Sequence, residues 1–278
     1  MYNFKAGLQM YSVRNYMEED VESTLKQVSE AGFEYVEFAG FFGRTSQEIK
    51  NLLEKYNLKC ASVHQGYEDF AEQKQDSVDY LKELGVKYVC MPWLDKKSHI
   101  GGENFEKSII EITKAAKFLG ENGIELLYHN HEFEFELYND KFLLDQLIDS
   151  VPDNMLKYQV DTCWVNFAGY NPVEYLSGLA GKAPVIHIKD YICSKIPVQT
   201  VSCQDINARR SNIIKTHDEC GFEFRPLGQG VMDIPGLLKA AEQTGTKYVI
   251  VEHDDVSQGM TQMEMAIEGR RYLKELGV

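Results

Sequence analysis

The chain has 278 residues, a length typical of a single α/β barrel of about 250 residues and too long for a minimal domain. Its 43 acidic and 29 basic residues give a formal net charge of −14, which argues against a nucleic-acid partner because non-specific binding to nucleic acid needs a basic surface. No run of about 18 apolar residues occurs, and the N-terminal residues lack a basic start, so we expect neither a membrane span nor a signal peptide.

Short runs rich in β-branched and aromatic residues alternate with longer amphipathic stretches along the whole chain. The first cycles predict strands at residues 6–11, 35–38, 59–64 and 86–92, and helices at 18–31, 46–56, 70–84 and 104–119. The later cycles predict strands at 124–129, 158–161, 185–189 and 248–252, and helices at 141–150, 172–179, 233–244 and 261–276. Eight strand–helix cycles without a linker predict one domain over residues 1–278, a parallel sheet closed into a (β/α)8 TIM barrel.

Residues 191–226 interrupt this alternation, and we find no clear element in them. We therefore expect a long loop insertion after the seventh strand, on the face of the barrel where TIM-barrel active sites lie. Long loops of this kind are usually functional or mobile. The segment is either a lid over the active site or an insertion without a catalytic role.

Histidines gather at the predicted carboxyl ends of the strands. Five of the seven lie at or just past these ends, namely His64, His129, His131, His187 and His253. In a barrel those ends converge on one mouth, where the active site is built. A single histidine at a strand end is usually structural, but five at one rim indicate a functional site.

Carboxylates occupy the same rim. Glu37, Asp161 and Glu252 end the second, sixth and eighth predicted strands, and each follows an apolar run. A carboxylate in such a place is costly to bury unless it is paired or binds a metal. Lys189 is the only basic residue similarly placed, which is too few for three carboxylates. We therefore predict one divalent metal ion, and mixed His and carboxylate ligands suit Mn, Co, Zn, Mg or Fe.

Five blocks of this sequence resemble the sugar phosphate isomerase/epimerase family, whose fold is the xylose-isomerase-like TIM barrel. The blocks are LQMYSVR at residues 8–14, YHNHEFEF at 128–135, VDTCW at 160–164, IHIKD at 186–190 and LGQG at 227–230. They span nearly the whole chain in order. The family includes inosose dehydratases, 3-dehydroshikimate dehydratases, hydroxypyruvate isomerases, ketose 3-epimerases and 3-keto-glycoside lyases. The resemblance therefore implies a fold and a metal chemistry more firmly than a substrate.

The resemblance also implies which side chains hold the metal. Asp161, His187 and Glu252 match the family's Asp, His and Glu on the sixth, seventh and eighth strands. The fifth strand carries His129 where the family has a glutamate, and Glu134 lies five residues later in the following loop. Either His129 or Glu134 is then the fourth ligand.

The remaining rim residues are candidates for catalysis and for substrate binding. Lys189 lies two residues after His187, so it points to the same side of an extended strand and either polarises a substrate oxygen or pairs with Asp190 or Glu252. Trp164 either stacks on a sugar ring or packs in the rim of the barrel core. The catalytic candidates are His131, Lys189 and Glu134, and the substrate-binding candidates are His64, Trp164, Glu37 and Gln9.

The resemblance implies a metal-dependent sugar or keto-sugar isomerase or epimerase, which moves a proton next to a carbonyl through an enediolate. The alternative is a keto-sugar or inosose dehydratase or lyase, including a 3-keto-glycoside lyase, because the same intermediate forms before a β-oxygen leaves. A barrel that only senses a sugar is less consistent with a complete set of metal ligands. An epimerase that acts on both faces of its substrate usually needs two flanking carboxylates. His129 in place of a glutamate weakens that expectation and strengthens the lyase alternative, although an isomerase or epimerase remains the first expectation.

The expected partner is a small-molecule sugar or keto-sugar, and a homo-oligomer is compatible with the sequence. The six cysteines form no CxxC pair, and Cys60 and Cys90 lie inside apolar runs, as small core residues do. Reduced thiols of this kind indicate a cytoplasmic enzyme.

Overall fold

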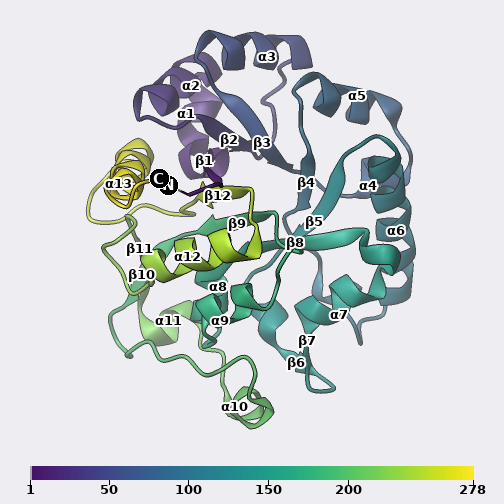
Figure 1. Ribbon diagram of the computed structural model, residues 1–278, viewed down its shortest axis with the longest axis vertical. Helices are drawn as coiled ribbons and strands as arrows, with labels where there is room; N and C mark the ends of the chain where they lie inside the picture. The colour runs from purple at the N-terminus through teal and green to yellow at the C-terminus, as the bar shows by residue number, and fades with distance from the viewer. Residues whose placement is uncertain (1) are drawn as a thin grey trace.

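A computed structural model describes residues 2–278 and contains a closed barrel of eight parallel strands, arranged in the order β1-β12-β9-β8-β5-β4-β3-β2 (Figure 1). The barrel strands are β1 (Lys5–Gln9), β2 (Tyr35–Phe38), β3 (Lys59–His64), β4 (Tyr88–Met91), β5 (Glu125–His129), β8 (Leu156–Asp161), β9 (Val185–Ile188) and β12 (Tyr248–Val251). The predicted TIM barrel and the existence of each of its eight strands are therefore confirmed.

Helices cover the outside of the barrel (Figure 1). Those on the predicted positions are α1 (Arg14–Glu19), α2 (Val21–Glu30), α3 (Ser46–Lys55), α4 (Glu68–Ala71), α5 (Gln75–Glu83), α6 (Phe105–Glu121), α7 (Leu143–Ser150), α9 (Pro172–Ser177), α12 (Ile234–Thr244) and α13 (Gln262–Glu275). The predicted helix at 18–31 is divided because Asp20 is extended and caps α2 by accepting from Ser23 N. Among residues 2–278, no helix is long and apolar enough to cross a membrane.

The segment 191–226 is more regular than the sequence indicates, so the prediction of no clear element there was wrong. It contains α10 (Ile206–Ser211) and α11 (His217–Cys220), and β10 (Asp190–Cys193) pairs antiparallel with β11 (Phe222–Arg225). The two strands pair across a long chain separation, and the helices are very short, so neither leaves a clear local pattern. The sequence also gives no sign of α8 (Thr162–Phe167) or of the short hairpin β6 (Leu137–Tyr138) and β7 (Lys141–Phe142).

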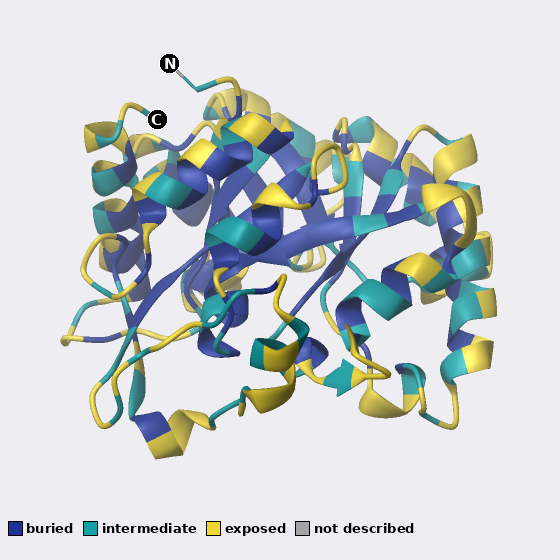
Figure 2. Cartoon of the chain, turned by 60° about the horizontal axis from the view of Figure 1, so that its bottom comes forward, coloured by how far each residue is buried: buried dark blue, intermediate teal, exposed yellow. Residues whose placement is uncertain are grey.

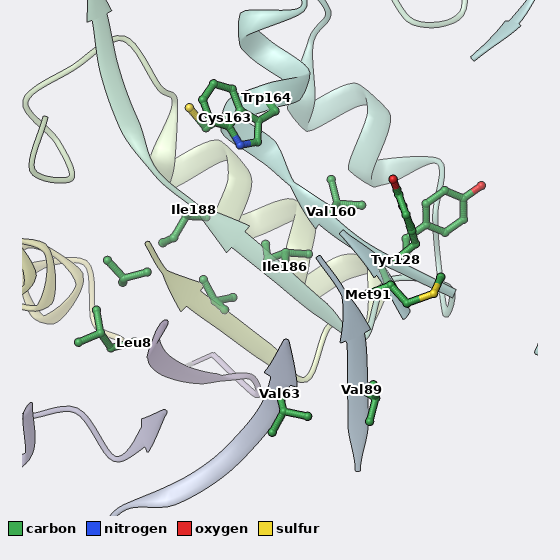
Figure 3. Packing of buried hydrophobic residues seen from close by; sticks show 14 of the residues in the cluster. Leu8, Val63, Val89, Met91, Tyr128, Val160, Cys163, Trp164, Ile186 and Ile188 are labelled. Carbon is green, nitrogen blue, oxygen red and sulfur yellow. The ribbon is translucent and has the colours of Figure 1, made fainter. Parts of the chain in front are cut away.

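The apolar core has two parts, one outside the barrel and one inside it. The outer part lies between strands and helices and includes Val160, Ile186 and Ile188 (Figure 3). The inner part fills the barrel with one side chain from each of five strands: Ala61, Cys90, Leu127, Val185 and Ile250. Figure 2 shows buried strands at the centre and exposed residues on the outer helix faces. Because side chains alternate along a strand, the residues two positions after Leu127, Val185 and Ile250 also face the barrel interior.

Asp190 connects the insertion to the barrel. Its side chain is buried, and its two oxygens accept hydrogen bonds from the backbone N–H groups of Tyr191, Gly228, Gly230 and Met232 at 2.9–3.1 Å. The aspartate thus fixes the start of β10 against the loop that leads into α12. Its role is structural, and it does not pair with Lys189.

We expect Asp190→Ala to lower the free energy of unfolding by on the order of 2–3 kcal/mol, because it leaves several backbone donors without an acceptor. Urea unfolding followed by circular dichroism measures this. Asp205→Ala is the control, since Asp205 also accepts two backbone N–H bonds but at the exposed start of α10. Equal losses in the two variants would contradict the role given to Asp190.

Candidate metal centre

A polar layer lies directly above the inner apolar residues of the barrel. On β5 the inward side chains are Leu127 and then His129, and on β9 they are Val185 and then His187. On β12, Ile250 is followed at the same spacing by Glu252, and Asp161 ends β8. The alternation of each strand therefore delivers one potential metal ligand to the same point.

His129, Asp161, His187 and Glu252 each offer one ligand atom within 4.8 Å of the others, and all four side chains are buried. His187 Nδ1 lies 2.6 Å from Glu252 Oε2, and His129 Nε2 lies 3.7 Å from Asp161 Oδ2. A second, overlapping group consists of His64, His129 and His187. Neither group among the described residues contains Glu134. The geometry thus brings the three candidate ligands expected from the family resemblance together with His129, and not with Glu134.

Glu134 belongs to a different network. Its carboxyl group accepts from Tyr128 Oη at 2.6 Å and from His131 N at 2.8 Å. Burial raises the pKa of Glu134 to about 8, so this group is largely protonated at neutral pH. A neutral carboxyl group turned toward Tyr128 is a poor ligand for a cation at the barrel mouth.

The donor atoms fit a divalent cation. Asp161 Oδ1 accepts from Cys163 N and Trp164 N at the start of α8, whereas the buried Oδ2 accepts no hydrogen bond from any described residue. Oδ2 is balanced by the charge of Lys189 Nζ at 3.1 Å, and it lies next to two imidazoles and a second carboxylate. A buried carboxylate oxygen without a hydrogen bond in such a group of donors is the environment that a metal ion completes. This donor set suits Mn²⁺, Fe²⁺, Co²⁺ or Zn²⁺.

Lys189 borders this centre. Its Nζ lies 2.9 Å from Glu252, 3.1 Å from Asp161 and 2.8 Å from Asp254. Burial by itself lowers the pKa of Lys189, but the three carboxylates outweigh burial and hold the pKa well above its usual value. The lysine is therefore an ammonium ion paired with Glu252, as one of the sequence alternatives predicted. Asp254 was missed, although it follows Glu252 at the spacing that keeps a side chain on the same face.

The histidines differ in protonation. Burial lowers the pKa of His187, but Glu37 and Glu252 on either side raise it to about 10. A metal ion would displace that proton, because a histidine ligand must be neutral. Burial, together with neighbouring cations, lowers the pKa of His129 well below its usual value and that of His131 to about 4. Both are therefore neutral at pH 7.

Burial raises the pKa of Asp161 to about 6, although Lys189 and His187 oppose the shift. Burial also acts to raise the pKa of Glu252, but Lys189 and His187 outweigh burial and hold it well below its usual value. Both carboxylates are mostly ionised at pH 7, and they carry the negative charge that a cation would neutralise.

A cavity of about 640 Å³ opens above the centre. Its walls include His64, His129, His131, Lys189, Glu252 and Asp254, with Tyr11 and Trp93 among the remaining residues. Tyr11 is 44% exposed and Trp93 is 55% exposed, and the sequence had not indicated either residue as part of the site. A cavity of this size lies within the range of roughly 300–1,000 Å³ typical of small-molecule sites.

Three of the predicted substrate-binding residues do not line the cavity. Gln9 and Glu37 are fully buried, and Gln9 Nε2 donates to Glu37 at 2.6 Å. Trp164 packs on the insertion, with its ring 5.5 Å from that of His217 and 5.7 Å from that of Phe222. His64 is the one of the four predicted substrate-binding residues that reaches the cavity.

A family model described as the xylose isomerase-like TIM barrel matches residues 25–276. The chain belongs to this family. An inosose dehydratase from Clostridium botulinum (strain Alaska E43 / Type E3) is 23% identical over 93% of this chain and 90% of the relative. The rhizopine catabolism protein MocC of Rhizobium meliloti is 24% identical over 84% of this chain and 74% of that protein.

Solved structures show the same fold. A sugar phosphate isomerase/epimerase from Parabacteroides distasonis ATCC 8503 superposes with a TM-score of 0.74 at 22% identity, over 99% of this chain and 94% of that one. An L-ribulose 3-epimerase superposes with a TM-score of 0.66 at 14% identity, over 98% and 94% of the two chains. Family and fold thus define a barrel of sugar-active enzymes with a buried His, Asp and Glu cluster consistent with a metal site.

We expect the protein to bind about one divalent ion per chain, and elemental analysis with calorimetric titration measures this. Asp161→Asn should abolish tight binding, and His129→Ala should weaken it by at least tenfold, because each removes a donor atom. Glu134→Gln should bind metal like the wild type, since the amide resembles the protonated carboxyl group already present. Loss of metal in Glu134→Gln with retention in His129→Ala would assign the fourth ligand to Glu134 instead.

Proposed function

We propose that this protein is a divalent-metal-dependent lyase that removes a proton next to the carbonyl group of a keto-sugar or keto-cyclitol and releases a β-oxygen. The observation that carries the proposal is a pair of groups with opposite protonation on one cavity wall. His131 is neutral because burial lowers its pKa to about 4, whereas Lys189 is cationic. Titratable groups whose pKa values are pushed apart are the usual sign of a base and an acid partner.

His131 is the proposed base. Its ring lies 5.2 Å from that of His129, and its buried Nδ1 has no hydrogen-bond partner among the described residues. A neutral imidazole at the cavity wall can accept the proton from the carbon next to the carbonyl group. A divalent ion on the four ligands would supply Lewis acidity that stabilises negative charge on the substrate oxygens.

Lys189 is the proposed electrostatic partner. When the bond between the β-carbon and its oxygen breaks, negative charge develops on the departing oxygen, and the ammonium group stabilises that charge by donating a hydrogen bond. The proton held by His131 then passes to this oxygen. The substrate thus becomes an enone plus water or an alcohol, and no further reactant is needed.

The relatives and the fifth strand both support a lyase. The inosose dehydratase from Clostridium botulinum aligns over most of the chain, and a dehydratase is a lyase of this kind. His129 occupies the place of a glutamate on β5, so Glu252 is the only glutamate in the ligand group. An isomerase or epimerase is the second candidate, because it shares the first proton transfer and the neighbouring solved structures include epimerases.

We expect a true substrate in deuterated water to lose the hydrogen bound to the carbon next to its carbonyl group. A lyase gives a conjugated product that absorbs in the ultraviolet, and an isomerase or epimerase gives a product with one solvent deuterium at a carbon. Proton NMR with parallel absorbance measures both. The Asp161→Asn variant should form neither the conjugated product nor the deuterium-labelled one. Full turnover with the hydrogen retained in the product indicates a hydride shift and would exclude proton transfer.

The cavity also favours a substrate larger than one ring. Tyr11 and Trp93 line the cavity and are partly exposed, unlike the buried ligands, and tryptophan is enriched at binding surfaces. A keto-glycoside could place its keto-sugar at the metal centre and its second ring on these side chains. The departing oxygen would then be the glycosidic one.

We expect Trp93→Ala to raise the KM for a keto-glycoside by about tenfold, in keeping with roughly 1.5 kcal/mol for a lost aromatic contact. The KM for a keto-monosaccharide should change little, which makes the smaller substrate the internal control. Steady-state kinetics on the two substrates measures the difference. A parallel rise in both KM values would show that Trp93 does not contact a second ring.

A further inference from the structure

Glu37 is a carboxylate at 0% exposure near the end of β2, beneath the cavity. Five nitrogen and oxygen atoms surround it, and the Cys90 thiol lies 3.8 Å from Oε2. On one oxygen it meets Gln9 Nε2 at 2.6 Å, His187 Nε2 at 2.7 Å and His64 Nε2 at 3.0 Å; on the other it meets Ser62 Oγ and Gln159 Nε2, the latter at 2.6 Å. All five partners come from other strands of the barrel or from its rim, so Glu37 is the centre of a buried network.

This arrangement leaves Glu37 no capacity for another partner. An ionised carboxylate has about four lone-pair sites, and Gln9, Ser62, Gln159 and His187 already supply four hydrogen bonds to it. Asp161 differs, since its Oδ2 accepts no hydrogen bond from the described chain. Glu37 is therefore neither a substrate ligand nor a metal ligand. Its fixed negative charge acts on the side chains around it.

Glu37 faces one nitrogen of a ligand histidine. Its Oε1 meets His187 Nε2, while His187 Nδ1 faces Glu252 at 2.6 Å. A neutral imidazole has one N–H, and an ionised carboxylate can only accept a hydrogen bond. Glu37 therefore favours the tautomer of His187 that carries its hydrogen on Nε2. Nδ1 is then left as a lone pair aimed at the candidate metal position. Carboxylate–histidine–metal arrangements of this kind orient ligand histidines in many metal sites.

The same network determines the tautomer of His129, the second candidate ligand histidine, through Gln159. Because Glu37 accepts only, the amide nitrogen of Gln159 must face it, which turns Gln159 Oε1 toward the histidines. That oxygen lies 3.1 Å from His129 Nδ1 and 2.7 Å from His64 Nε2. His129 therefore carries its hydrogen on Nδ1. Its Nε2 is free on the side of Asp161, at 3.7 Å from Oδ2.

We propose that Glu37 is the positioning residue of the metal centre. Directly for His187, and through Gln159 for His129, it selects the tautomer that presents a lone pair to the ion. The inference rests on the metal centre of the proposed function. It is independent of the substrate and of whether the reaction is an elimination or an isomerisation.

The test compares Zn²⁺ affinity in two variants that each convert a fully buried glutamate into glutamine. Glu37→Gln should bind Zn²⁺ about 10–100-fold more weakly than the wild type, the range typical for losing such an outer partner. Glu134→Gln is the matched control, because Glu134 is equally buried but contacts Tyr128 and His131 N. It should bind within twofold of the wild type. Calorimetric titration measures both, with circular dichroism to confirm folding.

A second measurement needs no variant and decides the question if Glu37→Gln does not fold. In the Zn²⁺-loaded wild type, ¹⁵N-edited NMR of the imidazole groups should show His187 with its hydrogen on Nε2 and His129 with its hydrogen on Nδ1. The opposite tautomer on either histidine, or wild-type affinity in Glu37→Gln, would overturn the role of Glu37 while leaving the metal centre intact. Wild-type protein that binds no Zn²⁺, Mn²⁺ or Co²⁺ would instead refute the metal centre itself and the inference with it.

Discussion

The balance of buried charge at the barrel mouth is the constraint on which the site depends. Three buried carboxylates, those of Glu37, Asp161 and Glu252, lie here with the partly exposed Asp254, and Lys189 provides one permanent cation. Charges removed from water are tolerated only when they are compensated. A proton on His187 supplies part of the compensation, which is why its pKa is raised to about 10. A divalent ion in place of that proton brings the group closer to neutrality, and so the electrostatics of the pocket favour metal.

The alternation of the strands made much of this site predictable. Two-residue spacing placed His129 and His131 on one side of β5 and His187 with Lys189 on one side of the chain leaving β9, and all four line or border the cavity. Depth within the barrel was not predictable. Whether an inward residue lies at the mouth or beneath it depends on the stagger between neighbouring strands, a property of barrel closure and not of local sequence. The side chain of Glu37 therefore faces the barrel interior, as predicted, but it lies beneath the cavity and not at its rim.

The predictions for residues outside the strands were wrong for a different reason. Trp164 lies three residues after Asp161, so a continued strand would have turned it away from the side that Asp161 faces. Instead Asp161 caps α8, and the helical turn carries the tryptophan toward the insertion, where it stacks with His217 and Phe222. The hairpin of β10 and β11 that completes this aromatic cluster is held by non-local pairing and by Asp190, neither of which leaves a periodic signal. No residue of 191–226 is among those that line the cavity, so the insertion packs beside the site and does not close it in this conformation.

Glu37 and His129 are connected by the same charge constraint. A glutamate at the fifth-strand position would add another carboxylate to a cluster that already contains Glu37, with no further cation among its neighbours to offset it. An imidazole provides a donor atom without a negative charge, and Gln159 links it to the carboxylate below. A histidine on β5 is thus the type of donor residue that fits a barrel with a buried carboxylate on β2. It also leaves one carboxylate fewer to flank a substrate, which is consistent with the proposed elimination, since proton exchange on both faces needs a base on each side.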